Sequence, residues 1–212
     1  MISKELLDGY WRFRNDSHSA DKGRYEQLAA LGQAPSALVV ACCDSRVDVS
    51  AIFSAGPGDL FIVRNVANLV PPFQPDGKFH STSAAVEYAT LVLKVPNIIV
   101  LGYSHCGGIA AYRQKLQGKP DNTDFIGTWL SQLEGLDVKE QDIKTFGQET
   151  AFELAGVRQS LANLRMFDAV REKETEGMLA LHGLHFDIGS GVVLALDEET
   201  DAFSPLPESV EA

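Results

Sequence analysis

The sequence predicts an α/β fold in which a mainly parallel central sheet carries flanking helices and an N-terminal helical arm. Three short, continuous apolar runs have the pattern of strands covered on both faces, and segments of helical composition lie among them. This alternation of buried strands with helices is typical of βαβ units. The length of 212 residues and the hydrophobic fraction of 45% favour one domain, residues 1–212, with a well-filled core.

Residues 1–31 form the predicted arm, which has two apolar stripes at helical spacing. The polar stretch 15–19 separates the stripes and is expected to break the helix. A segment with this many aromatic side chains must bury them against its own domain or against a second subunit, and the pattern alone leaves both interpretations open. The stripes are Leu6, Leu7, Tyr10, Trp11 and Phe13, followed by Tyr25, Leu28 and Leu31.

The predicted strands and helices follow in order after the arm. The first strand covers residues 37–41, and a Gly-Pro-Gly-Asp turn at 56–59 introduces the second strand at 60–63. A helix over 81–93 closes before Pro96, and the third strand covers 97–102. The remaining elements are helices over 109–116, 125–133 and 148–170, and segments 178–182, 186–188 and 192–196 that predict a hairpin at the sheet edge.

Composition and charge exclude several classes of function. The net charge is -11, and an acidic surface repels phosphate backbones, so nucleic acid is not an expected partner. No apolar run approaches the roughly 20 residues that span a bilayer, and the N-terminus has no secretory apolar region, so we expect a cytoplasmic protein without a membrane partner. Three cysteines do not form a disulfide framework and are expected to be buried, metal-binding or reactive.

Polar and thiol side chains cluster where the predicted strands end. Residues 42–46 (Cys-Cys-Asp-Ser-Arg) follow the first strand, Arg64 and Asn65 follow the second, and residues 103–106 (Tyr-Ser-His-Cys) follow the third. In open α/β sheets, chemistry collects at the carboxyl ends of the strands. Two such ends can bring Cys42 and Cys106 together, and this clustering predicts a catalyst.

The residues alone leave three interpretations of the two thiols. Thiolates combined with imidazole or carboxylate side chains are typical zinc ligands, and a catalytic zinc keeps one coordination position for water. Alternatively, Cys42 and Cys106 are small buried apolar residues. A third interpretation makes one of them a nucleophile at a helix N-terminus, although the sequence places no base beside it.

The same motifs strongly resemble those of the β-class carbonic anhydrases. The family signature Cys-x-Asp-Ser-Arg is present at 42–46, and Gly-His-x-x-Cys-Gly-Gly is matched at 102–108, with tyrosine in place of histidine. The resemblance covers roughly residues 20 to 197. Further stretches that resemble the family are 32–35, 58–68, 83–89 and 182–188.

The resemblance implies a zinc enzyme, a lyase that interconverts carbon dioxide and bicarbonate. Cys42 and Cys106 would be zinc thiolates, and Arg46 would hold Asp44 so that it accepts a hydrogen bond from zinc-bound water. In some members the aspartate ligates zinc instead, in a closed state. Those members often carry a tryptophan where this chain has Val39, which favours an open site with Asp44 off the metal.

The resemblance also implies a substrate pocket and an assembly. Gln33 would hydrogen-bond carbon dioxide or bicarbonate, and the pocket would lie partly across a dimer interface. The expected assembly is a homodimer or a dimer of dimers, with the arm packed on the partner. The apolar walls would be Phe61, Val66 and Tyr88, while Gly107 and Gly108 would open a helix whose amides face the site.

Tyr103 is the main departure from the family pattern because it stands where the family has its histidine ligand. A phenolate can bind a metal, but it makes the ligand shell more negative than neutral histidine does, and its oxygen would overshoot the metal. His105 does not replace the missing ligand, because neighbours at a strand end point in different directions, and we expect it to be solvated or to lie behind the ligands. Of the later histidines, His182 is expected to be structural and His185 to lie at the surface or edge.

We therefore expect a carbon dioxide hydratase with an altered zinc shell, in which Tyr103 or Asp44 completes the set with the two thiols. Three alternatives remain at this stage. The chain is a metal-poor, non-catalytic binding or regulatory member of the fold; or it acts on carbonyl sulfide or carbon disulfide; or Tyr103 is a deliberate replacement of a histidine.

Overall fold

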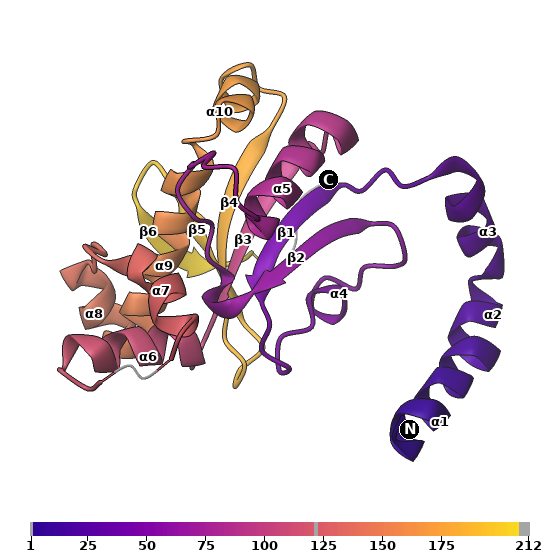
Figure 1. Ribbon diagram of the computed structural model, residues 1–212, viewed down its shortest axis with the longest axis horizontal. Helices are drawn as coiled ribbons and strands as arrows, with labels where there is room; N and C mark the ends of the chain where they lie inside the picture. The colour runs from indigo at the N-terminus through magenta and orange to yellow at the C-terminus, as the bar shows by residue number, and fades with distance from the viewer. Residues whose placement is uncertain (1, 121–122, 208–212) are drawn as a thin grey trace.

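A six-stranded sheet forms the centre of the protein in the computed structural model, which describes residues 2–120 and 123–207 (Figure 1). The strand order is β2-β1-β3-β4-β5-β6, in which β1 to β4 are parallel and β5 and β6 are antiparallel. The predicted mainly parallel sheet is confirmed. The strands are β1 (Ala37–Cys42), β2 (Leu60–Asn65), β3 (Asn97–Tyr103), β4 (Ala180–Phe186), β5 (Val193–Asp197) and β6 (Ala202–Pro205).

The C-terminal end of the sheet differs from the predicted edge hairpin. β4 lies inside the sheet, parallel to β3 and antiparallel to β5, and β6 forms the edge beyond β5. The apolar pattern does not reveal β6, because this four-residue strand buries one side chain, Phe203. The opposite edge of the sheet is β2.

Most predicted helices are confirmed, with one split and three additions. The predicted helix over 148–170 divides because Phe167 adopts an extended conformation, and its ring packs on Phe73 with 5.1 Å between ring centroids. Three short helices, α4, η2 and α8, carry too little periodicity to be predicted. The helices after the arm are α4 (Val49–Ile52), η2 (Val66–Asn68), α5 (Ser81–Glu87), η3 (Tyr88–Leu93), α6 (Gly107–Leu116), α7 (Ile126–Leu130), η4 (Ser131–Leu133), α8 (Glu140–Phe146), α9 (Gln148–Leu164) and α10 (Asp168–Thr175).

The sheet separates two apolar cores, because side chains alternate between its faces. Leu38 and Val40 of β1 join the core that contains α9, whereas Val39 and Ala41 join the core that contains α6 and α7. α9 packs closely on the sheet, since a Cβ atom at Gly102 would lie 2.7 Å from Val157 Cγ2. This close packing carries the middle of α9 to the end of β3.

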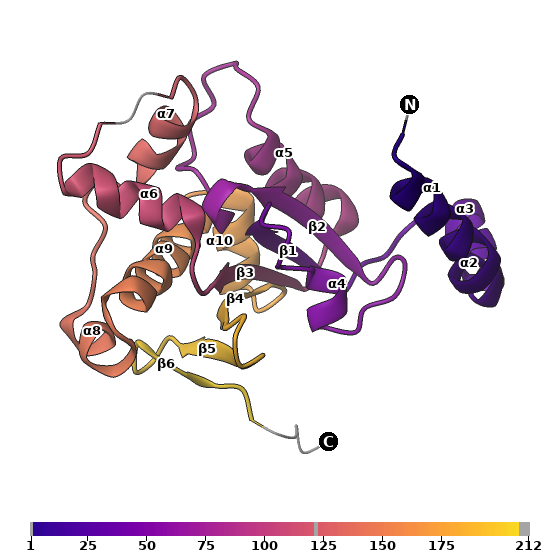
Figure 2. The same ribbon diagram turned by 90° about the horizontal axis from the view of Figure 1, so that it is seen from below.

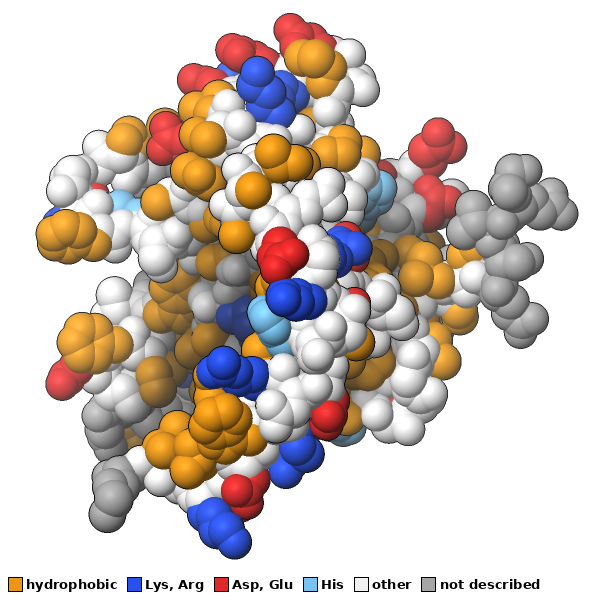
Figure 3. All heavy atoms as spheres, turned by 90° about the vertical axis from the view of Figure 1, so that its right-hand side faces the viewer, with side chains coloured by type: hydrophobic (Ala, Val, Ile, Leu, Met, Phe, Trp, Pro, Cys, Tyr) orange, Lys and Arg blue, Asp and Glu red, His pale blue; other side chains and the backbone are white. Residues whose placement is uncertain are grey.

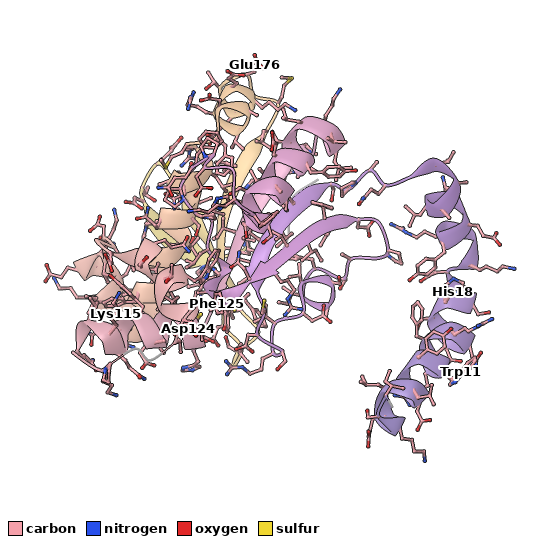
Figure 4. The ribbon with its side chains drawn as sticks, in the orientation of Figure 1. Trp11, His18, Lys115, Asp124, Phe125 and Glu176 are labelled. Atoms are coloured by element: carbon pink, nitrogen blue, oxygen red, sulfur yellow. The ribbon has the colours of Figure 1, made fainter. Side chains whose placement is uncertain are left out.

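The N-terminal arm stands away from the sheet in both ribbon views (Figures 1 and 2). None of its residues is buried, and the Trp11 and His18 side chains lie clear of the body (Figure 4). The expected break at 15–19 is wrong: a π-helical turn carries the helix through this stretch, and the interruption falls at Asp21. The arm consists of α1 (Lys4–Arg12), η1 (Phe13–Ser17), α2 (His18–Ala20) and α3 (Lys22–Leu31).

The arm meets the rest of the chain at its last helix. Arg24 forms an ion pair with Asp59 and donates a hydrogen bond to the Pro57 carbonyl. Leu28 packs on Gly58, where a Cβ atom would lie 2.6 Å from Leu28 Cδ2. Within residues 2–120 and 123–207, no helix is long and apolar enough to cross a membrane.

Candidate active site

The fold brings the two predicted thiols together at the carboxyl ends of the parallel strands. Cys42 ends β1, and Cys106 precedes the first residue of α6, in the short loop that follows the neighbouring strand β3. Both side chains are buried. A hydrogen bond joins the two sulfur atoms, with Cys106 as the donor. The prediction that two strand ends unite these thiols therefore agrees with the structure.

Backbone amides surround the two sulfur atoms. The Ala67 amide donates to Cys42 Sγ at 3.3 Å, and the Asp44 amide also faces this sulfur. The Ile109 amide, in the first turn of α6, faces Cys106. The hydrogen bond from Cys106, with these amides, lowers the pKa of Cys42 to about 5, while the same bond and burial raise the pKa of Cys106. One thiolate and one thiol therefore share this site at neutral pH.

Tyr103 places its hydroxyl beside the thiolate. The ring is 1% exposed, and its hydroxyl lies 3.0 Å from Asp44 Oδ2 and 3.4 Å from Cys42 Sγ, both as acceptors. Burial, followed by the hydrogen bonds with both sulfurs, raises the pKa of Tyr103 well above its usual range. In the metal-free protein, this side chain is a neutral phenol that reaches from the thiolate to the carboxylate of Asp44.

Arg46 holds Asp44 in a bidentate pair. Asp44 Oδ1 accepts from the Arg46 amide and from Nε, both at 2.9 Å, and Oδ2 accepts from Nη2 at 2.7 Å. These charge-assisted bonds keep the pKa of Asp44 well below its usual range. Arg46 Nη2 also donates to the His105 carbonyl at 3.1 Å, so the guanidinium ties the loop after β1 to the loop after β3.

Arg64 organises the loop after β1 in a way that the sequence did not indicate. Its guanidinium donates to three backbone carbonyls, those of Cys42 at 2.8 Å and of Asp44 and Val47 at 2.7 Å. The sequence places Arg64 after the predicted strand 60–63, whereas the structure has it within β2, and nothing in the pattern shows that its target is backbone rather than a carboxylate. Its role is to hold the turn that presents Cys42 and Asp44.

Gly107 and Gly108 begin α6 as expected, and only the second is closely packed. A Cβ atom at Gly108 would lie 2.8 Å from Ala67 Cβ and 3.1 Å from Val66 Cγ1, whereas one at Gly107 meets nothing within 4 Å. Ala67 has a left-handed conformation (φ 66°) and carries the amide that binds Cys42. The glycine at 108 therefore allows η2 to approach the thiol.

We expect Gly108→Ala to lower the free energy of unfolding by about 1–3 kcal/mol through overpacking against η2. Gly107→Ala is the matched control, and it should be neutral or stabilising by up to about 1 kcal/mol, because alanine favours the helix. Urea unfolding of the two variants beside the parent measures both effects. Equal stabilities would contradict the close contact between η2 and α6.

Three of the expected substrate residues lie away from the thiols within one chain. Phe61 pairs with Leu38 in the sheet register, four residues before Cys42, and its ring packs on Tyr88 at 5.8 Å between centroids. Gln33 is exposed in the segment that joins the arm to β1. Val66 does lie near the site, against Gly108.

Apolar side chains reach the surface on the side of the molecule that carries the arm (Figure 3). Tyr88 is 45% exposed beside the edge strand β2, and Leu91 and Val92 of the same helix are also exposed. This surface and the aromatic stripe of the arm are two apolar regions that the chain does not cover by itself.

Two histidines, His182 and His185, lie in environments opposite to those expected. His185 is buried and bound to Glu153 at 2.9 Å, and His182 is exposed and contacts Asn97 at 3.0 Å, so the expectation of a structural His182 and a surface His185 is wrong. His185 lies on β4, inside the sheet rather than at its edge. His105 has an exposed side chain near Glu149, as expected of a solvated residue.

Comparison with known proteins identifies the family. A sequence model described as carbonic anhydrase matches residues 37–193, and β carbonic anhydrase 3 of Arabidopsis thaliana is 36% identical over 193 residues, covering 89% of this chain and 74% of that protein. This chain belongs to the β-class carbonic anhydrases. A carbonic anhydrase of Pseudomonas aeruginosa is 35% identical over 213 residues, covering 98% of this chain and 94% of that protein.

Solved β-class carbonic anhydrases have the same fold. The β-carbonic anhydrase CcaA has a TM-score of 0.85 and 31% identity, covering 96% of this chain and 98% of that one. One of two tetrameric β-carbonic anhydrases from Sordaria macrospora has a TM-score of 0.75 and 29% identity, covering 91% and 95% of the two chains. The expected family and fold class are therefore confirmed.

β-class carbonic anhydrases are generally zinc enzymes, which raises the question of whether these residues suit zinc. Among residues 2–120 and 123–207, no group of three histidine, cysteine, aspartate or glutamate side chains is placed to hold a metal, so the Tyr103 oxygen is the candidate third donor beside the two thiols. Its separation of 3.4 Å from Cys42 Sγ is close to the roughly 3.5 Å between a sulfur and an oxygen ligand of tetrahedral zinc. The two thiols suit zinc in kind, and the one separation between Tyr103 and Cys42 suits it once the phenol loses its hydrogen.

Proposed function

We propose that this β-class carbonic anhydrase catalyses the reversible hydration of carbon dioxide, with zinc held by Cys42, Cys106 and Tyr103. The observation that carries the proposal is the convergence of three donor side chains on one buried point. Tyr103 Oη lies within 3.4 Å of both Cys42 Sγ and Asp44 Oδ2, and Arg46 stands behind the carboxylate. A structural cluster of thiols alone has no need of a carboxylate held ionised at its rim.

Each residue then has a distinct task in the reaction. Zinc, when bound, supplies the Lewis acidity that lowers the pKa of water to about 7. Asp44 accepts a hydrogen bond from the attacking water through Oδ2 and so fixes the direction of its lone pair. Arg46 keeps Asp44 ionised and oriented, because it fills both lone pairs of Oδ1 and one of Oδ2. Asp44 therefore accepts hydrogen bonds and does not act as an acid.

Tyr103 must lose its phenol hydrogen before it can bind zinc. Burial and the sulfur neighbours oppose this loss by raising the pKa of Tyr103. Metal ligands bind in their deprotonated form, so zinc uptake at this site should release protons and strengthen as the pH rises. With tyrosine as the ligand, zinc binding should therefore require a higher pH than it does at a histidine site.

We further propose a homodimer, or a dimer of dimers, in which subunits share their substrate pockets. Phe61, Tyr88 and Gln33 lie away from the thiols of their own chain, and Tyr88 is exposed beside the edge strand β2. This supports a pocket whose apolar walls and Gln33 come partly from the partner. The arm, which buries none of its aromatic side chains on its own chain, would pack on the partner. The cytoplasmic location stays a prediction.

A metal-poor, non-catalytic member of the family is the second candidate, and one observation favours it. The Tyr103 hydroxyl lies within hydrogen-bond distance of the Cys42 thiolate and of Asp44, so its one hydrogen can serve these two negative groups without a metal. In this candidate the phenol hydrogen occupies the place of the cation. Zinc content and activity distinguish the two functions.

The test of the proposed function measures zinc, phenolate and activity together. We expect purified protein to hold zinc at or below one ion per chain, the phenolate absorbance of Tyr103 to appear as zinc is added, and stopped-flow hydration to rise at alkaline pH. Tyr103→Phe is the control, since it keeps the ring and removes the donor oxygen. Absence of zinc after loading would leave the non-catalytic candidate, and a pH profile typical of a histidine site would reject Tyr103 as ligand.

A further inference from the structure

The peptide unit between His105 and Cys106 is held at both of its polar ends. Its carbonyl oxygen accepts from Arg46 Nη2 at 3.1 Å, and its amide donates to Glu153 Oε1 at 3.0 Å. A cation therefore lies at the negative end of the peptide dipole and a carboxylate at the positive end. Both bonds are charge-assisted, the stronger class of hydrogen bond in proteins.

Glu153 is placed for this contact by α9, which packs closely on Gly102 of the adjoining strand. Its side chain is 4% exposed, and its second oxygen lies 2.9 Å from His185 Nε2. A carboxylate only accepts, so the hydrogen of this contact belongs to His185. Burying a carboxylate is costly unless its oxygens are paired, and here each oxygen has one donor.

The loop that Glu153 holds has a conformation that its sequence does not favour. His105 has a φ of 60°, in the left-handed region that residues with a Cβ atom rarely adopt. Its side chain is exposed and cannot enforce this geometry. The left-handed conformation of His105 must therefore be held by neighbouring residues. The charged neighbours that bind this loop do so at the two ends of the His105–Cys106 peptide. Cys106, whose thiol points to Cys42, begins directly at that peptide.

We propose that Glu153 is a positioning residue for Cys106: with Arg46 it clamps the His105–Cys106 peptide, and His185 holds Glu153 in place. The clamp fixes the direction of the Cys106 thiol before any metal arrives. Its consequence for metal affinity rests on the proposed zinc site, whereas its consequence for the peptide does not. Glu153 contacts the Cys106 amide and His185 contacts Glu153, so both act on Cys106 through the backbone.

The sequence offers a selective probe, because His105–Cys106 is the only His-Cys dipeptide in the chain. Protein labelled with ¹³C at histidine carbonyls and with ¹⁵N at cysteines therefore gives one coupled signal, from this peptide alone. The amide proton shift and its exchange with solvent report the bond to Glu153, and the carbonyl shift reports the bond to Arg46. Metal-free protein suffices for this measurement.

We expect Glu153→Leu to shift the Cys106 amide proton upfield and to speed its exchange at least tenfold. Glu153→Gln should largely retain both, because its amide oxygen can still accept from Cys106. Asp142→Asn is the matched control, since Asp142 is also buried and paired with a cation, Arg158, but lies away from this loop. It should leave the labelled peptide unchanged.

A second readout uses cobalt(II), whose thiolate bands report the geometry of the two sulfurs. Glu153→Leu should weaken cobalt binding about 10- to 100-fold, the usual effect of losing a group behind a metal ligand, with Glu153→Gln close to the parent. An unchanged amide signal in Glu153→Leu, or an equal change in Asp142→Asn, would overturn the clamp. If the parent binds no cobalt, the proposed zinc site fails, and the labelled peptide still decides on Glu153. His185→Gln gives the same decision if Glu153→Leu does not fold.

Discussion

Replacing Tyr103 with histidine is expected to raise zinc affinity at pH 7 by up to about 10³-fold and to raise the hydration rate with it. The physical reason is the proton that each ligand must lose. An unperturbed phenol has a pKa near 10, about three units above neutrality, whereas imidazole is mostly neutral at pH 7. Burial raises the pKa of Tyr103 further, and the intrinsic strength of a phenolate ligand offsets part of the difference.

Histidine also changes what Asp44 can bind. The Tyr103 oxygen lies 3.0 Å from Asp44 Oδ2, so a zinc-bound phenolate would place a second negative oxygen beside this carboxylate. The shorter, neutral imidazole would remove that repulsion and leave Oδ2 free to accept from water, which is the arrangement that hydration needs. Activity should therefore rise by more than zinc occupancy alone accounts for.

The measurement is a zinc competition titration between pH 6 and 9, with stopped-flow hydration of the loaded proteins. The advantage of Tyr103→His should shrink about tenfold for each unit of pH, because the tyrosine site must release one proton more than the histidine site when it binds zinc. Tyr103→Phe separates the loss of the phenol oxygen from the gain of a nitrogen. A pH-independent difference in affinity would show that Tyr103 is not the titrating ligand.

Replacing Asp44 with asparagine should lower kcat/KM about 10²-fold or more, a typical loss when a group positioned on the reacting water is removed. An asparagine amide turns one acceptor into a donor. It must face either the Arg46 guanidinium, a donor itself, or the point where Tyr103 and water donate. Either orientation breaks a hydrogen bond that the carboxylate makes.

The effect of Asp44→Asn is best measured in the Tyr103→His background, where the rate is expected to be highest. Zinc content should stay near that of the parent, because Asp44 is held on Arg46 and not by the thiols. Asp168→Asn is the control: Asp168 also pairs with an arginine, Arg171, but on an exposed turn of α10. Full activity in Asp44→Asn would remove the carboxylate from the proposed reaction.

The sequence predicted the centre of the fold well, because the relevant signals are local. Strands such as residues 37–41 and 97–102 are covered on both faces and are therefore continuous apolar runs. The helix break expected at 15–19 was wrong because it also rested on a local signal. A polar stretch suggests a break, but a π-helical turn carries the helix through it, on an arm with no buried residue. Edge strand β6 buries too little to leave a pattern.

At the candidate site, the residues at strand ends were predictable and those behind them were not. Cys42, Asp44 and Cys106 follow directly from apolar runs, so topology alone brings them together. Glu153 stands 47 residues from the cysteine amide it binds, within a helix whose pattern shows only that it is helical. The predicted exposure of His185 was wrong because a polar residue on a strand suggests a solvent-facing position, whereas this side chain binds a buried carboxylate.

The hydrogen bonds between the loops at the carboxyl ends of the parallel strands affect how the protein unfolds locally. Arg46 joins the loop after β1 to the loop after β3, Ala67 joins η2 to Cys42, and Tyr103 joins β3 to Asp44. Local unfolding proceeds in contiguous cooperative units, and a segment tied to two others cannot open alone. These three segments should therefore share one opening free energy in native-state hydrogen exchange, while the arm, tied mainly at Arg24 and Leu28, frays independently.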